Sequence, residues 1–99
     1  MKIPKKLKIL GHWFRVQLVE TEIIPGLGGD FQGRYNLIRI AQDQAESQRA
    51  EVFLHEIMEL ISVSLELGIE HPQISALSEG LFQVLRDNCL DFSDKSGEE

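Results

Sequence analysis

The first half of the chain alternates between hydrophobic and polar residues in the manner of β-strands. In residues 7–20, LKILGHWFRVQLVE, apolar strand-forming residues recur at nearly every second position: Ile9, Trp13 or Phe14, Val16 and Leu18. Gly11 interrupts this segment and predicts a turn or a bulge. We expect Trp13 to lie in the core and His12 at an edge.

A second extended segment follows a stretch rich in Pro and Gly. Residues 23–35, IIPGLGGDFQGRY, predict a loop with room for one short strand, and YNLIRIA, residues 35–41, resumes the extended pattern. The glycines are interpreted as turn formers, because no Lys-Ser/Thr pair or helix follows them as in a phosphate-binding loop. Three antiparallel strands are the simplest account of this half.

The second half has helical periodicity. Residues 44–67 repeat apolar side chains every three or four positions, at Ala50, Phe53, Leu54, Ile57, Leu60, Ile61 and Leu65. Gly68 is expected to cap this helix. Residues 71–88 predict a second helix with Pro72 in its first turn and with one apolar stripe: Ile74, Leu77, Leu81, Val84 and Leu85. The pattern predicts a single α+β domain over residues 1–90 and an acidic flexible tail over 91–99.

Composition narrows the possible functions. The net charge is -6 and the pI near 5.0, which argues against a nucleic-acid partner. The lysines of KIPKKLK, residues 2–8, are interpreted as a solvated arm. The one cysteine, Cys89, implies no disulfide, and no apolar run reaches the length of a membrane span or a signal peptide. These features predict a cytoplasmic protein without a membrane partner.

The segment FLHEIMELI, residues 53–61, carries the candidate chemistry. His55 and Glu59 are four residues apart, which places both on one side of the first helix, where they could bind one metal ion. Glu56 would then lie beside the ion and act as general base toward water. The alternative is a solvated polar face that His55 and Glu59 share with Glu51 and Glu66.

Two residues could complete the coordination, His71 and Glu79. The distance along the chain favours Glu79, which follows His55 by the interval found in glutamate-type zinc peptidases. Helix geometry favours His71, because Glu79 is expected to point away from the apolar stripe, about 12 Å further along the helix axis. Ligand chemistry also favours His71, since two imidazoles and one carboxylate are typical of catalytic zinc, whereas a His55, Glu59 and Glu79 set would suit a harder ion.

The order of these segments resembles a known group of proteins. KILGHWFRVQLVE, YNLIRIA, FLHEIMELI and ISALSEGLFQVLRDN, from Lys8 to Asn88, are similar to small metallopeptidase-like proteins of phage and prophage regions, related in design to minigluzincins. The resemblance implies a zincin-like fold, with His55 as first metal ligand, Glu56 as base and YNLIRIA as the edge strand that holds a peptide. Glu59 departs from the His-Glu-x-x-His motif of that group.

The sequence therefore leads to one main hypothesis and two alternatives. The main hypothesis is a minimal metal-dependent peptidase that binds zinc or another divalent ion through His55, Glu59 and His71. Water activated by the metal, with Glu56 as base, would attack a peptide bond. The first alternative is a non-catalytic zincin-like module that binds a partner protein. The second is a non-haem iron site, because two His and one carboxylate also form the facial triad of oxygenases.

Overall fold

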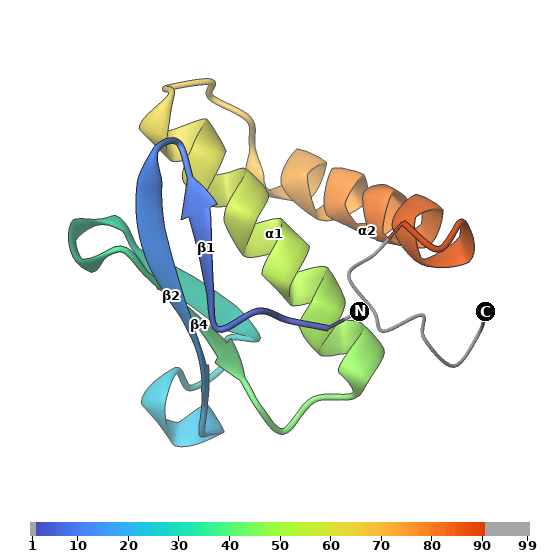
Figure 1. The fold of residues 1–99 in the computed structure, drawn as a ribbon, viewed down its shortest axis with the longest axis horizontal. Helices are drawn as coiled ribbons and strands as arrows, with labels where there is room; N and C mark the ends of the chain where they lie inside the picture. Colours follow the sequence, from blue (N-terminus) through green and yellow to red (C-terminus); the bar gives the residue numbers. More distant parts are fainter. Residues whose placement is uncertain (1, 91–99) are drawn as a thin grey trace.

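The fold is a mixed β-sheet covered on one face by two helices. The computed structural model describes residues 2–90, so the predicted tail 91–99 lies outside the described residues. Helix α1 (Glu46–Ser64) lies against the sheet, and α2 (His71–Asp87) packs on α1 (Figure 1). The predicted α+β class is confirmed. No helix of the described residues is long and apolar enough to cross a membrane.

The sheet has four strands and one parallel pair, which differs from the expected three antiparallel strands. Its strands are β1 (Lys6–Ile9), β2 (His12–Val19), β3 (Gly29–Gln32) and β4 (Leu37–Ala41), in the spatial order β1-β2-β4-β3. Strands β2 and β4 are parallel, and the other two pairs are antiparallel. Short 3₁₀ turns over Thr21–Ile23 and Gly33–Tyr35 flank β3.

This strand order corrects the position of the expected peptide-holding edge. The segment YNLIRIA contains β4, which lies in the interior of the sheet with both neighbours bonded to it. Ile38 and Ile40 of β4 are fully buried in the core. The edge strands are β1 and β3, so a peptide could join the sheet only alongside one of these two.

A tight hairpin joins β1 to β2. Leu10 and Gly11 form its two-residue loop between the paired residues Ile9 and His12, and both loop residues have positive φ, 51° and 85°. Two positive φ values are the signature of a type I′ turn, which matches the right-handed twist of the flanking strands. The turn predicted at Gly11 is confirmed.

The expected position of Trp13 in the core is wrong. Trp13 is 58% exposed, whereas Phe14 is buried with Ile9 and Val16 in the core. Because side chains alternate across a strand, only one of two adjacent aromatic residues can face the core. Here the register with β1 and β4 selects Phe14.

The hairpin turn offers a test of the fold. Leu10→Asn is expected to stabilise the protein by about 0.5–1 kcal/mol, because a left-handed conformation is strained for Leu and Asn-Gly is the favoured type I′ pair. A change of this size corresponds to a rise of roughly 3–6 °C in the melting temperature of a domain this small. Thermal unfolding followed by circular dichroism measures it. Leu10→Ala, which relieves no backbone strain, is the control, and an equal gain in both variants would contradict the turn assignment.

Helix α1 is buried on two sides because it lies between the sheet and α2. Phe53 and Leu60 face the sheet, whereas Ala50 and Leu54 pack against Phe82 of α2. The helix ends at Ser64, earlier than the expected cap at Gly68. Glu66 instead takes the left-handed conformation that closes the helix, at φ 55°.

The buried face of α2 differs from the predicted stripe. Leu77, Leu81 and Val84 are 53%, 41% and 45% exposed, whereas Ile74, Ser78 and Phe82 are buried. The small Ser78, whose hydroxyl donates to the carbonyl of Ile74 at 2.9 Å, lies in this buried face. The face that α2 turns toward α1 therefore begins at its first residue, His71, three residues before Ile74.

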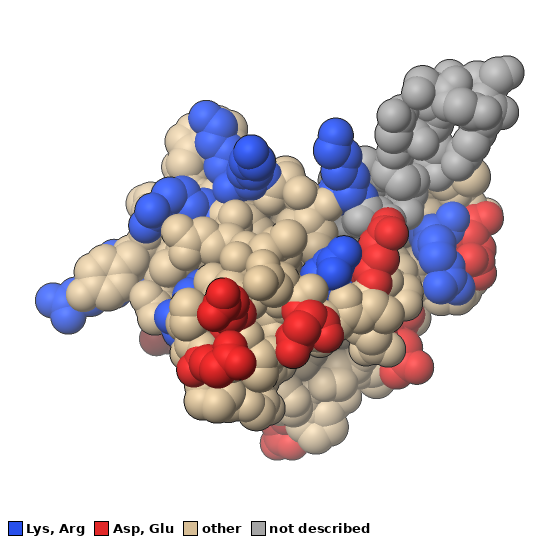
Figure 2. Space-filling model, turned by 90° about the horizontal axis from the view of Figure 1, so that it is seen from below, with Lys and Arg blue, Asp and Glu red and all other residues tan. Residues whose placement is uncertain are grey.

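Charged residues are unevenly distributed over the molecule. Residues 1–19 contain five Lys and Arg and no Asp or Glu, whereas all 16 acidic residues follow. Figure 2 shows one face of the molecule, on which Lys and Arg side chains lie mainly in the upper half and acidic side chains lie beside and below them. The net charge is negative, but residues 1–19 are positively charged and the acidic residues all lie after them.

Candidate metal centre

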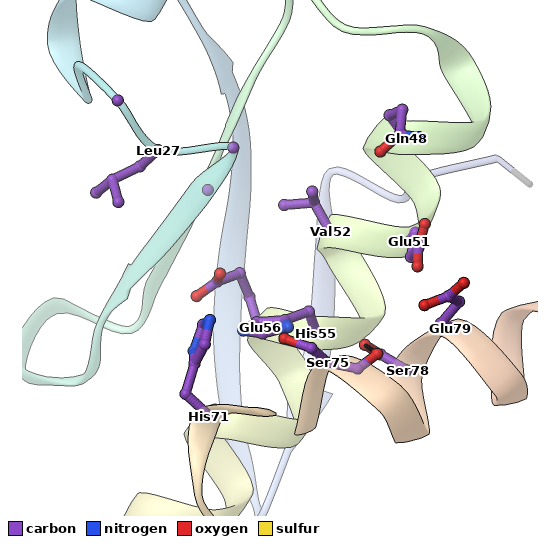
Figure 3. Close-up of a pocket in the computed structure, with 13 residues that line it drawn as sticks. Leu27, Gln48, Glu51, Val52, His55, Glu56, His71, Ser75, Ser78 and Glu79 are labelled. Carbon is purple, nitrogen blue, oxygen red and sulfur yellow. Dashed lines mark hydrogen bonds between the residues drawn. The ribbon is translucent and has the colours of Figure 1, made fainter. Parts of the chain in front are cut away.

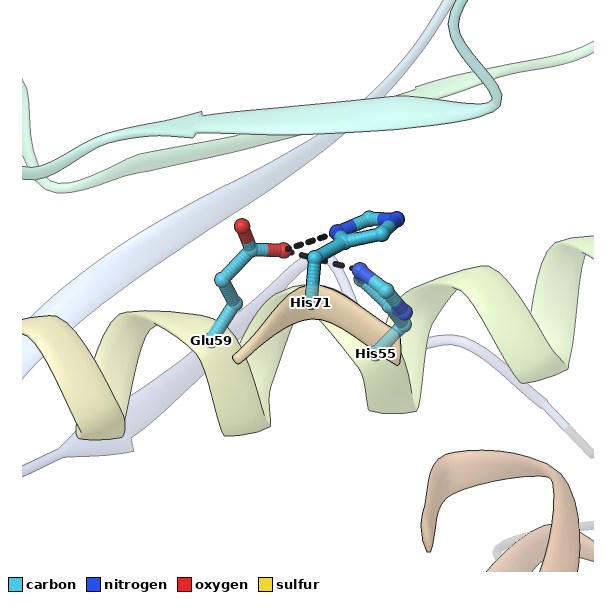
Figure 4. Close-up of side chains that lie close together, drawn as sticks. All are labelled: His55, Glu59 and His71. Atoms are coloured by element: carbon cyan, nitrogen blue, oxygen red, sulfur yellow. Dashed lines mark hydrogen bonds and ion pairs between the residues drawn. The ribbon is translucent and has the colours of Figure 1, made fainter. Parts of the chain in front are cut away.

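Three side chains from the two helices meet at one point. The Nε2 atom of His55 lies 2.8 Å from Oε2 of Glu59, and Nδ1 of His71 lies 3.8 Å from the same oxygen. The two imidazole centroids are 4.7 Å apart, at an interplanar angle of 62°. One carboxylate oxygen thus faces a ring nitrogen of each histidine (Figure 4). This arrangement brings together the His55, Glu59 and His71 that the sequence singled out.

The connection between the helices positions His71. At the start of α2 the side chain of Glu70 accepts a hydrogen bond from the backbone of Gln73, while the amide of Glu70 donates to Oε1 of Gln73 at 3.0 Å. This capping box fixes the entry of α2. The amide of Ile69 donates to the hydroxyl of Ser62 at 3.2 Å, which ties the connection to the end of α1. His71, as first residue of α2, is therefore held above His55 and Glu59.

The three residues suit a divalent ion in number and in type. One ligand atom from each lies within 4.8 Å of the other two. Tetrahedral ligands at about 2.0–2.1 Å from zinc are roughly 3.3 Å apart, so small side-chain rotations would close the set around an ion. His55 is 14% exposed in its side chain, Glu59 31% and His71 67%. One open side, at His71, would leave a coordination position accessible to a substrate, as catalytic sites require.

His55 and Glu59 are only partly solvated, with 14% and 31% of their side chains exposed. The polar side of α1 is partly covered, because β3 approaches it from one direction and the start of α2 from the other. Partial burial weakens the competition of water for these side chains, so that a His-carboxylate contact there is stronger than on an open helix. Among the described residues, Glu79 does not join the group.

Glu56 is buried next to this group. Its residue exposure is 6%, and it is among the few buried polar residues of the described chain. Burial raises the pKa of Glu56 to about 7, and the negative charges of Glu59 and Asp30 add to the effect. Asp30 is itself held by Arg39, whose Nε donates to Oδ1 at 2.9 Å. A carboxyl group that titrates near neutrality can both accept and return a proton, which suits a general acid-base.

A cleft of about 380 Å³ is lined by His55, His71 and Glu56 (Figure 3). It lies between the start of β3, the middle of α1 and the first turns of α2, and three glutamates but no Lys or Arg line it. The lining residues are Gly26, Leu27, Gly28, Gly29, Gln48, Glu51, Val52, His55, Glu56, His71, Ser75, Ser78 and Glu79. Glu79 thus borders the cleft, further along α2 than His71.

Two glycines allow β3 to pack at a short distance from α1. A Cβ atom on Gly29 would lie 2.6 Å from Cγ1 of Val52 and 2.9 Å from the carbonyl oxygen of Arg39. Gly28 is held in place by Gln44, whose Nε2 donates to its carbonyl oxygen at 3.0 Å and to that of Ala41 at 2.8 Å. These glycines were interpreted as turn formers, but the structure requires them for close approach.

The sequence interpretation missed two contributions to the site. The first is the burial of Glu56, which depends on the glycines of the β3 segment that faces α1. The paired glycines 28 and 29 directly before Asp30 and Phe31 were the available signal, since Gly within a strand often marks a close backbone approach. The second is Asp30, whose charge contributes to the raised pKa of Glu56.

Comparison with known proteins gave no match: no family model, no curated protein and no solved structure matches the chain.

Proposed function

We propose that the chain is a minimal metal-dependent peptidase domain in which His55, Glu59 and His71 bind one zinc ion and Glu56 is the general base. The observation that supports this most directly is the convergence of the three ligand atoms within 4.8 Å beside a buried carboxyl group with a raised pKa. A purely structural polar cluster has no need of an adjacent acid whose burial is costly.

The reaction assigns a separate role to each group. When bound, zinc would lower the pKa of a water molecule and polarise a carbonyl group. Glu56 lines the same cleft, so its carboxylate is placed to take the proton from that water and to deliver it to the leaving amine. In the metal-free protein the pKa of Glu56 is about 7, and a bound cation would favour the ionised form that accepts the proton.

Strand β3 is the edge at which a peptide would bind. It pairs with β4 on one side, and on its other side it forms the end of the sheet. Gly28 and Gly29, at its start, border the cleft. An extended peptide added alongside β3 would gain backbone hydrogen bonds and pass in front of the ligand group. This replaces the edge that the resemblance assigned to YNLIRIA.

The first experiment measures metal binding. Protein purified without chelator is expected to bind one equivalent of zinc, detected by native mass spectrometry with elemental analysis. At a free zinc concentration 100-fold above Kd, the free energy of unfolding should rise by about 2.7 kcal/mol. His55→Ala, Glu59→Ala and His71→Ala should each weaken binding by roughly 100-fold or more, since even loss of an outer-shell partner costs 10- to 100-fold.

Glu79→Ala is the matched control, because Glu79 borders the cleft but lies outside the ligand group. Loss of zinc in Glu79→Ala with retention in His71→Ala would assign the third ligand to Glu79. Absence of stoichiometric metal in the parent protein, after incubation with zinc, manganese and ferrous iron, would rule out the peptidase and leave the non-catalytic binding module. Oxygen consumption by the ferrous form would favour the non-haem iron alternative.

Activity is tested with a peptide library and the zinc-loaded protein. Glu56→Gln should retain zinc, because Glu56 is not in the ligand group, yet lose cleavage by about 10²- to 10⁴-fold. Mass spectrometry of the products identifies the cleaved bonds. A Glu56→Gln variant that cleaves as fast as the parent would contradict the role of base.

A further inference from the structure

A basic surface lies on the sheet face opposite the helices. Lys6 and Lys8 of β1 are paired with Arg15 and Trp13 of β2. Residues directly opposite each other in an antiparallel pair project from the same face. Phe14 and Val16, which alternate with Trp13 and Arg15, point into the core. Lys6, Lys8, Trp13 and Arg15 therefore share the outer face, which neither α1 nor α2 covers (Figure 1).

The cations of this face have no carboxylate partner among the described residues. The ion pairs of Arg39 and Arg86 involve Asp30 and Asp87, and none of the described ion pairs includes Lys6, Lys8 or Arg15. No Asp or Glu occurs before residue 20. Screening limits attraction to about 8–10 Å at physiological salt, so an anion at this face responds to the local cations more than to the net charge of -6.

Trp13 is the centre of this surface. Its ring is 58% exposed, and the Nζ atoms of Lys6 and Lys8 lie 5.3 and 5.9 Å from its centroid. The two lysines are two residues apart in one strand, about 7 Å, so a single extended anionic chain can contact both while a flat group stacks on the indole.

A second exposed aromatic residue lies in the turn that follows β3. The amide of Arg15 donates to the carbonyl oxygen of Asn36 at 2.9 Å. The turn Gly33–Tyr35 therefore lies where the parallel strands β2 and β4 begin to pair. Tyr35 is 63% exposed, and Arg34 adds a further cation to this turn. An exposed ring among unpaired cations on an open sheet is a combination that binds unpaired bases and their phosphates.

We propose that this outer face, formed by Lys6, Lys8, Trp13 and Arg15, binds single-stranded nucleic acid. Trp13 stacks on a base, and the three cations contact the neighbouring phosphates. A duplex is a poorer fit, because its bases are already stacked and the exposed indole would find no free ring face. The proposal reverses the expectation drawn from the net charge, because that expectation treated the lysines as a solvated arm. It does not depend on the metal centre.

The test uses the full chain and a fluorescently labelled deoxythymidine oligomer of about ten nucleotides, within the usual site size of such surfaces. Binding is measured by fluorescence anisotropy at several salt concentrations. Three phosphate contacts predict a slope of log K against log salt of about −2. Trp13 is the only tryptophan of the chain, so its own fluorescence should be quenched on binding of unlabelled oligomer.

Variants separate stacking from charge. Trp13→Ala should weaken binding by roughly tenfold or more with the salt slope unchanged, whereas Lys8→Gln should reduce the slope by about 0.7. Arg86→Gln is the matched control, because Arg86 is a cation on α2 that is paired with Asp87 at 3.0 Å, and it should bind like the parent. All three positions are exposed, and unchanged thermal unfolding establishes that the variants are folded.

Other anions serve as competitors. Inorganic polyphosphate is expected to compete weakly and to leave tryptophan fluorescence nearly unquenched, because it has no base to stack. Equal affinity for polyphosphate and oligomer, together with no effect of Trp13→Ala, would overturn the proposal in favour of simple polyanion attraction. Binding to vesicles that contain phosphatidylserine without binding to the oligomer would overturn it in favour of a membrane surface. Absence of oligomer binding at low salt would also overturn it.

Discussion

Glu56→Gln is expected to stabilise the metal-free protein by about 3 kcal/mol above pH 7 and to leave it nearly unchanged below pH 4.5. The reason is the raised pKa of Glu56, about 7 in the folded protein against an ordinary value of 4.5. Below pH 4.5 the carboxyl group is protonated in both the folded and the unfolded chain, so ionisation costs nothing. Between pH 4.5 and 7 the folded protein retains the proton that the unfolded chain has lost.

Stability must therefore fall as the pH rises through this window, by about 1.4 kcal/mol per unit, and the full cost remains above pH 7. Gln has nearly the same shape and no charge, which removes this dependence. Urea unfolding in the presence of a chelator, at intervals from pH 4 to 8.5, measures the difference between parent and variant. The chelator matters because a bound cation would offset the repulsion from Glu59 and Asp30.

Glu51→Gln is the matched control for this experiment. Glu51 lies on α1 and borders the same cleft, but it is not buried. The variant carries the same change of formal charge, so its stability curve should run parallel to that of the parent. If Glu56→Gln also ran parallel, Glu56 would not be desolvated in the folded protein, and its assignment as a base tuned to neutral pH would fail.

Gly29→Ala is expected to destabilise the protein by roughly 2–4 kcal/mol, a large effect for one methyl group. The new Cβ would lie 2.6 Å from Cγ1 of Val52 and 2.9 Å from the carbonyl oxygen of Arg39. The side chain of Val52 can rotate, but the carbonyl oxygen belongs to the paired strand β4 and cannot move without breaking the sheet. Urea unfolding gives the change in free energy from the shift in midpoint.

Gly33→Ala is the comparison, because a Cβ on Gly33 would meet nothing within 4 Å. Its effect should stay within about 0.5 kcal/mol of the parent. The double variant Gly29→Ala with Val52→Ala should recover only part of the loss, since the contact with Arg39 persists. Equal stability of Gly29→Ala and Gly33→Ala would mean that β3 does not approach α1 closely, which would also remove the physical reason for the burial of Glu56.

Helical periodicity and ligand chemistry were sufficient to predict the fold class and which three candidate side chains lie together. The spacing of His55 and Glu59 follows from one turn of helix, and His71 was favoured over Glu79 from helix geometry and ligand chemistry. In the structure His71, and not Glu79, lies with the other two. These inferences succeeded because each depends on residues close in sequence or on the entry to a single helix.

The features that sequence could not predict depend on distant contacts. The parallel pairing of β2 with β4 places YNLIRIA inside the sheet. The alternation of apolar and polar residues predicts a strand but does not predict which strands it pairs with. Hydrophobicity alone assigned the buried face of α2 to Ile74, Leu77, Leu81, Val84 and Leu85. Ile74 is buried and Leu85 is partly buried, but Leu77, Leu81 and Val84 are exposed. The small Ser78 and the aromatic Phe82 pack against α1 instead.

The proposed ligand group and base lie within residues 55–71, which comprise the second half of α1, the connection and the first residue of α2. An ion held there would link positions at most 16 residues apart, so little chain entropy is lost in forming the site. The sheet contributes to the environment of the site, because it buries Glu56 and its edge strand β3 lies beside the cleft. In the proposed function, metal binding would therefore depend on two helices and the short connection between them, whereas the raised pKa of Glu56 would depend on the sheet.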